Sequence, residues 1–252
     1  MLGGKSADSL DVKIVKNSGE IIETEIERYE FPELKPYFVK KAAAQKNEKR
    51  FYALNNETGY INLGKIKAKE LNEVFENYQN KKAIILDLRN YPKNISADNL
   101  ANLLYPEKSI FIKVMAAKYP SYAEYDIDSA LKLIKNPFKI GKKNKDYYKG
   151  KIILLVNSST ASMSEFFAMA IQNSPNCTTL GEQTFGAVMN RMAVPLKDGT
   201  SIDFTGFGAF YPDDTSVQRK GLKIDHYLKK STKNYTDDFY IEEALKLIDH
   251  SL

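Results

Sequence analysis

The chain has 252 residues, of which 43% are hydrophobic, and its net charge is +5. This length and apolar content allow one large domain with a sizeable core, and the single cysteine, Cys177, excludes an internal disulfide. No apolar run approaches the roughly 20 residues that a membrane-spanning helix needs, so we expect no stable insertion of this chain into a membrane. The first residues, MLGGKSADSLDVKIV, lack the basic and apolar regions of a signal peptide.

Alternating apolar and polar residues predict β-structure near the N-terminus. Segments 10–16 and 20–29 flank the turn residues NSG, so we expect them to form a hairpin. The charged connector at 33–50 has no pattern that decides its structure. The segments FYAL and YINL flank NNETG at 55–59 and predict a second hairpin.

The middle of the chain alternates predicted strands and helices. The apolar spacing at 68–80 predicts a helix, whereas AIILDL (83–88) and KIILLVN (151–157) are continuous apolar runs, typical of strands buried on both sides. Further elements are expected as a helix at 98–105, a strand in SIFIKVMA, a helix around Phe166, a strand in TTLGEQTFG, a hairpin in MAVPLKDGTSIDFTG and a C-terminal helix around Leu245. This alternation predicts an α/β fold.

Much of the positive charge lies in the run KIGKKNKDYYKGK at 139–151. The run reads as a solvated loop. The alternative is a nucleic-acid-binding patch, but only two tyrosines interleave the lysines and no binding motif accompanies them. We therefore expect no nucleic-acid partner. No His/Cys cluster has the spacing of metal ligands, so nothing in the sequence implies a metal or a cofactor.

One predicted strand ends in small hydroxyl residues where a helix begins, in LLVNSSTASMSEFFAMAIQ at 154–172. A serine in the first turn of a helix lies beside unpaired N–H groups and the positive end of the helix dipole, which favours an oxyanion. A strand, a turn, a serine and a helix is one way to present a nucleophile. Serine is also a good N-cap, and Ser162 with Glu165 fits the capping box S-x-x-E. This stretch alone leaves both interpretations open.

Five segments in order carry a family resemblance: GYINL, AIILDLRNYP, LLVNSSTASMSEFFAMAI, LGEQTFG and GLKIDHYL followed by IEEALKLI. Over roughly residues 51–250 the chain resembles the C-terminal processing (tail-specific) peptidases and their tricorn-core relatives, and DLRNYP is most similar to the Bacteroides-type branch. The resemblance implies a ClpP/crotonase-like α/β fold, a β-spiral with outer helices. It also implies a serine endopeptidase that cuts polypeptides near their C-termini, and an extracytoplasmic parent protein.

We predict three segments. Residues 1–31 resemble the last β-strands of a PDZ domain, 32–50 are a connector, and 51–252 are the peptidase-like core. About thirty residues are too few for an independent domain. We therefore expect the chain to be cut at its start, or to begin inside a degraded module.

The resemblance assigns the nucleophile to Ser162 and an oxyanion-binding N–H to Met163. Glu165 is expected to be structural and tied to the start of the helix. The lysine base that follows TFG in the processing peptidases is replaced by Ala187, and the position of the tricorn-type glutamate is Gln218. A hydroxyl with no adjacent base is a poor nucleophile at neutral pH.

The second oxyanion turn of the family contains two glycines, and Lys93 and Asn94 stand there in this chain. If the Lys93 ammonium is desolvated near Ser162, it can act as the missing base; the alternative is a solvent-facing lysine. His226 and His250 lie outside the family's catalytic positions. Two functions remain: an active serine endopeptidase acting through Ser162, or a catalytically impaired or inactive peptide-binding member of the family. The oligomeric state is not predicted.

Overall fold

The computed structural model describes residues 8–16, 18–46, 49–119, 124–126, 137–189, 191–229 and 237–249. These residues form two compact units. The smaller unit holds the described residues up to Lys49 together with 237–239. The larger unit holds Arg50–Lys229 and the described residues from Tyr240 onward.

The smaller unit contains the predicted N-terminal hairpin and a helix that no pattern indicated. Strands β1 (Ser9–Val15) and β2 (Ile21–Glu27) pair antiparallel. The connector is mostly helix α1 (Phe31–Lys46). Of its side chains at 32–40, Leu34 is the buried one, so the apolar period that reveals a helix is missing. The likeness of the hairpin to a PDZ domain stays a prediction.

The larger unit is built on a six-stranded sheet with strand order β14-β10-β9-β5-β4-β3. Neighbouring strands are parallel, except for the antiparallel pair β3–β4 that forms the second predicted hairpin. The strands are β3 (Phe51–Ala53), β4 (Thr58–Asn62), β5 (Ala83–Asp87), β9 (Lys151–Val156), β10 (Cys177–Gly181) and β14 (His226–Tyr227). This arrangement confirms the α/β class.

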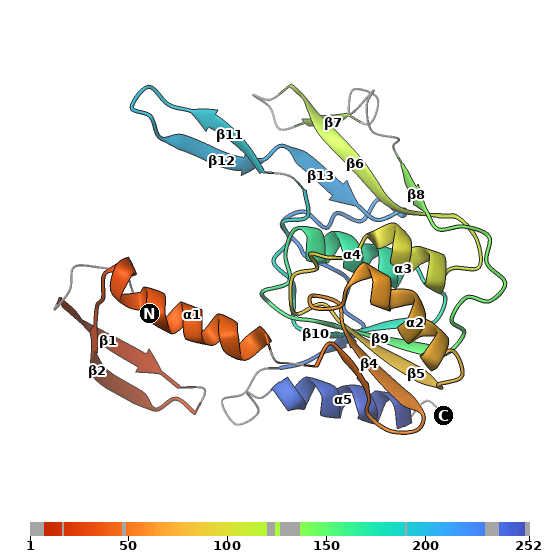
Figure 1. The fold of residues 1–252 in the computed structure, drawn as a ribbon. Coiled ribbons are helices and arrows are strands. Elements are labelled where there is room, and N and C mark those ends of the chain that lie inside the picture. The colour runs from red at the N-terminus through yellow and green to blue at the C-terminus, as the bar shows by residue number, and fades with distance from the viewer. Residues whose placement is uncertain are drawn as a thin grey trace. The chain divides into compact units, whose positions relative to one another are not determined.

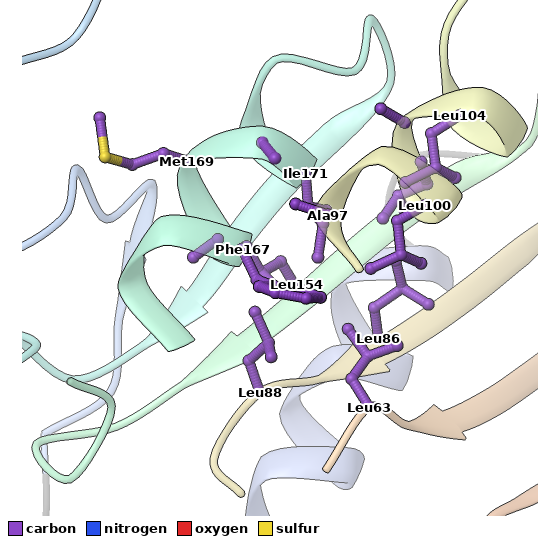
Figure 2. Packing of buried hydrophobic residues seen from close by; sticks show 14 of the residues in the cluster. Leu63, Leu86, Leu88, Ala97, Leu100, Leu104, Leu154, Phe167, Met169 and Ile171 are labelled. Atoms are coloured by element: carbon purple, nitrogen blue, oxygen red, sulfur yellow. The ribbon is translucent and has the colours of Figure 1, made fainter. Parts of the chain in front are cut away.

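Helices cover both faces of this sheet (Figure 1). Helices α2 (Ala68–Tyr78), α3 (Ala97–Leu104) and α4 (Met163–Gln172) pack on one face, and α5 (Asp237–Asp249) packs on the other. Along β5, Leu86 joins the cluster under α2–α4, whereas its neighbour Ile85 joins the cluster under α5. Figure 2 shows the first cluster, in which Leu86 and Leu154 lie beneath α3 and α4. Because both faces are buried, β5 and β9 read as continuous apolar runs.

The remaining strands form smaller sheets. Strand β6 (Ser109–Tyr119) pairs with β7 (Glu124–Asp126), β8 (Phe138–Ile140) and β13 (Phe207–Phe210), and β11 (Arg191–Pro195) pairs with β12 (Ser201–Thr205) in the predicted hairpin. Strands β7, β8, β13 and β14 were not predicted, because two to four residues are too few to show a period of two. The lysines of the basic run after β8 are exposed, at 142, 143, 145 and 149. Within the described ranges, no helix has the length and apolar character needed to cross a membrane.

Candidate active site

The turn between β9 and α4 uses its polar side chains to close its own backbone. The N–H of Asn157 donates to Thr160 Oγ1 (3.0 Å), and the N–H of Ser159 donates to Asn157 Oδ1 (3.0 Å). The buried Thr160 hydroxyl also donates to the carbonyl of Leu88, just beyond β5 (3.3 Å). The side chains of Asn157 and Thr160 therefore serve to close the turn.

Ser162 is the exception in this turn. It is the N-cap residue of α4, but its side chain makes no capping hydrogen bond, and its backbone has φ 54° and ψ −121°. A non-glycine residue at positive φ costs on the order of 1–3 kcal/mol, and such strain concentrates at functional sites. The S-x-x-E capping box that the sequence allowed is not formed. Ser162 is half-buried at a strained strand-to-helix turn, as in a nucleophile elbow.

Glu165 fastens the loop at 184–187 to the start of α4. The residue is fully buried, and its carboxylate accepts from Thr184 Oγ1 (2.6 Å), the N–H of Gly186 (2.7 Å) and the N–H of Ala187 (2.8 Å). The expected structural role is confirmed, but the expected partner is not. The carboxylate bonds a loop that is distant in sequence rather than the N–H groups at the helix start. The three donors compensate the cost of burying its negative charge.

The loop that Glu165 holds lies directly against the serine. The N–H of Ser162 donates to the carbonyl of Ala187 at 2.9 Å. Position 187, where the resemblance expects a lysine base, is thus adjacent to the candidate nucleophile, and it carries a methyl group. No proton acceptor is supplied from this position.

Position 218 lies next to the same loop. The N–H of Arg219 donates to the carbonyl of Gly186 at 2.7 Å, so the segment containing Gln218 runs beside the TFG turn. The Oε1 atom of Gln218 is buried and has no hydrogen-bond partner among the residues that the structure describes. Arg219 and Lys220, both exposed, follow Gln218 directly, so the segment beside this loop also carries two cationic residues that the sequence analysis did not single out.

The proposed oxyanion groups come from two places. The N–H of Met163 belongs to the first turn of α4, where backbone donors have no intrahelical acceptor. Lys93 and Asn94 lie exposed in the loop after β5, and the Asn94 carbonyl accepts from the N–H of Ala68 at the start of α2 (3.2 Å). The desolvation that a Lys93 base requires is not present, since its side chain is exposed. Their catalytic roles stay predictions.

The residues DLR after β5 form a scaffold. The buried carboxylate of Asp87 accepts from the Tyr60 hydroxyl (2.6 Å) and pairs with Arg89 (2.7 Å). The Arg89 guanidinium lies 4.5 Å from the ring centre of Tyr240 on α5. Burial, with the neighbouring Asp87 charge second, raises the pKa of Tyr60. Asp87 and Arg89 thus join the sheet to α5 and form part of the scaffold.

The histidines do not join the site. His226 is exposed in β14, and His250 lies outside the described residues. In the part of the chain that the structure describes, no group of three or more His, Cys, Asp or Glu residues is arranged to hold a metal ion.

A strained, uncapped serine between a parallel strand and a helix is the local arrangement that presents the nucleophile in many serine hydrolases. Comparison with known proteins gives the family: residues 57–228 match the model of "Peptidase family S41", and the chain belongs to this family. The expected resemblance to the C-terminal processing peptidases is thereby confirmed.

Individual relatives agree with this assignment. The chain is 26% identical to a carboxyl-terminal-processing protease of Synechocystis over 206 residues, which is 75% of this chain and 43% of that protein. A putative peptidase from Parabacteroides merdae has a TM-score of 0.67 at 18% identity, over 79% of this chain and 63% of that one. The photosystem II D1 C-terminal processing protease has a TM-score of 0.54 at 17% identity, over 97% and 61%. The ClpP/crotonase-like α/β fold is confirmed, and the chain spans less than half of its Synechocystis relative.

Proposed function

We propose that this chain is the peptidase domain of a serine endopeptidase that acts on polypeptides, with Ser162 as the nucleophile. The observation that carries the proposal is the strained, uncapped Ser162 at the start of α4, bonded through its N–H to Ala187. A serine retained only as a cap would use its hydroxyl to bond a helix N–H, and would not need positive φ.

The chemistry follows from the placement of these groups. The Ser162 hydroxyl attacks the carbonyl carbon of a peptide bond, and the proton leaves to a base. The negative charge then develops on the carbonyl oxygen, where the N–H of Met163 and the dipole of α4 stabilise it. The backbone of the Lys93–Asn94 turn is the second proposed donor. Glu165 contributes by holding Ala187 in place.

The weak point of this site is the base, and it favours a second function. Ala187 has no proton acceptor, and the amide of Gln218 does not take up a proton at neutral pH. The methyl group at position 187, next to Ser162, therefore supports a second proposal, in which the chain is a slow or inactive member of the family that binds polypeptides without cutting them. In both cases we propose an extended peptide as the ligand and an extracytoplasmic parent protein.

The test is hydrolysis of unfolded casein by the chain and by three variants: Ser162→Ala, Ala187→Lys and Ala187→Met. A positioned general base contributes about 10²–10⁴-fold in rate. We expect Ala187→Lys to raise the rate by roughly this factor, and adding Ser162→Ala to abolish the gain. Ala187→Met is the matched control, because it adds a similar length without an amine and should give no gain.

The outcomes separate the two functions. Activity of the natural chain that is lost in Ser162→Ala supports the endopeptidase and requires a base from another part of the protein. Casein binding without hydrolysis, together with a gain in Ala187→Lys, supports the binding protein. If the chain does not bind casein and Ala187→Lys gives no gain in rate, the proposal of a polypeptide-directed site is refuted.

A further inference from the structure

Two exposed apolar side chains belong to the two segments that meet at the candidate nucleophile. Phe185 is 70% exposed, the highest value among the large apolar residues of the described chain, and Met163 is 42% exposed. Their neighbours in sequence, Thr184, Gly186 and Ser164, are buried. The fold therefore turns these two side chains outward from segments that are otherwise packed.

The backbone that carries Phe185 is held firmly. Its own N–H donates to the carbonyl of Thr160 (3.0 Å). On either side, the Thr184 hydroxyl and the N–H of Gly186 both donate to the Glu165 carboxylate (2.6 and 2.7 Å). A large ring on an anchored backbone is preorganised, because little further ordering of the main chain is needed when a ligand covers it.

The position of the ring relative to the serine suits an extended peptide. The carbonyl of Ala187 accepts from the N–H of Ser162, and Phe185 lies two residues before Ala187. Two residues of chain span at most about 7 Å, which is also roughly the spacing of alternate side chains on one face of an extended peptide. A peptide whose carbonyl lies at Ser162 thus brings a side chain one or two residues away to Phe185.

We propose that Phe185, together with Met163, is a subsite that receives an apolar side chain of the polypeptide within two residues of the carbonyl at Ser162. The inference rests on the proposed function, and it applies equally to a peptidase and to a binding protein. A ligand side chain that covers the ring removes apolar surface from water, which is favourable. An aliphatic or aromatic side chain can do this without burying an unpaired polar group.

The test uses the Ser162→Ala chain, so that the ligand is not cut, and two fluorescein-labelled ten-residue peptides. One peptide has leucines at its central positions, and the other has serines there. Fluorescence anisotropy should show that the leucine peptide binds at least about tenfold more tightly, since one buried aliphatic side chain accounts for such a factor. Adding Phe185→Ala should remove most of this preference, and Phe185→Leu should retain part of it. Phe204→Ala, which removes an exposed ring on β12, is the control and should change nothing.

Each other result is decisive. Equal binding of the two peptides, or an unchanged preference in Phe185→Ala, overturns the subsite and leaves the proposed function standing. Failure of the leucine peptide to bind also overturns the subsite, and the casein assay then decides whether the proposed function survives. The exposure of Phe185 makes misfolding of its variants unexpected, and circular dichroism checks it.

Discussion

Replacing Glu165 with alanine removes the one carboxylate that anchors the loop beside Ser162. Three donors lose their acceptor: the Thr184 hydroxyl, the N–H of Gly186 and the N–H of Ala187. A hydrogen bond to a charged group contributes about 1.5–3 kcal/mol, and such contributions within one cluster are not additive. The substitution leaves these three neutral donors without an acceptor, and one buried donor left unpaired costs about 1–3 kcal/mol, so the three together should cost about 3–5 kcal/mol after partial relaxation. We expect a loss of this size in the free energy of unfolding.

The measurement is urea unfolding at pH 7, followed by far-ultraviolet circular dichroism. Glu165→Gln keeps one acceptor but turns an amide N–H₂ toward donors, so its loss should be smaller than that of Glu165→Ala and still above about 1 kcal/mol. Glu73→Ala, on the exposed face of α2, is the control and should stay within about 0.5 kcal/mol of the natural chain. A loss below 1 kcal/mol in Glu165→Ala would refute this reasoning, because the three bonds would then be replaced by water at little cost.

Two further predictions concern the sheet and the buried tyrosines. Gly181→Ala should destabilise the fold by about 3 kcal/mol or more, because its Cβ would lie 1.9 Å from the carbonyl oxygen of Val156 on β9. The control is Gly199→Ala, which lies in open space at φ +84° and should cost about 1 kcal/mol. Equal urea unfolding midpoints for the two variants would contradict the predicted clash. Burial raises the pKa of four tyrosines most strongly, so the stability they contribute is complete below the ordinary tyrosine pKa of about 10 and falls as the pH rises above it. Absorbance at 295 nm should show part of the tyrosines ionising only as the circular dichroism signal is lost. Ionisation of all tyrosines before that signal is lost would contradict the prediction. These tyrosines are Tyr60, Tyr105, Tyr148 and Tyr211.

The sequence predicted those helices and strands whose buried and exposed residues follow a regular local pattern. The helix at 68–80 and the runs at 83–88 and 151–157 carry their burial pattern within a few neighbouring residues, and the structure has α2, β5 and β9 there. The family was readable for a similar reason, since its short motifs occur in one order along the chain. Helix α1 and the shortest strands were missed because they lack such a pattern.

The site required the tertiary structure. Ser162 and Glu165 look like a capping box in sequence, yet the carboxylate bonds residues 19 to 22 positions further along the chain. The positive φ of Ser162, its bond to Ala187 and the outward ring of Phe185 all depend on how the loop at 184–187 is placed. Apolar periodicity is a property of consecutive residues, whereas these bonds join segments that only the packed sheet brings together. The sequence by itself therefore determined the fold class and the candidate serine, and the tertiary structure decided what that serine touches.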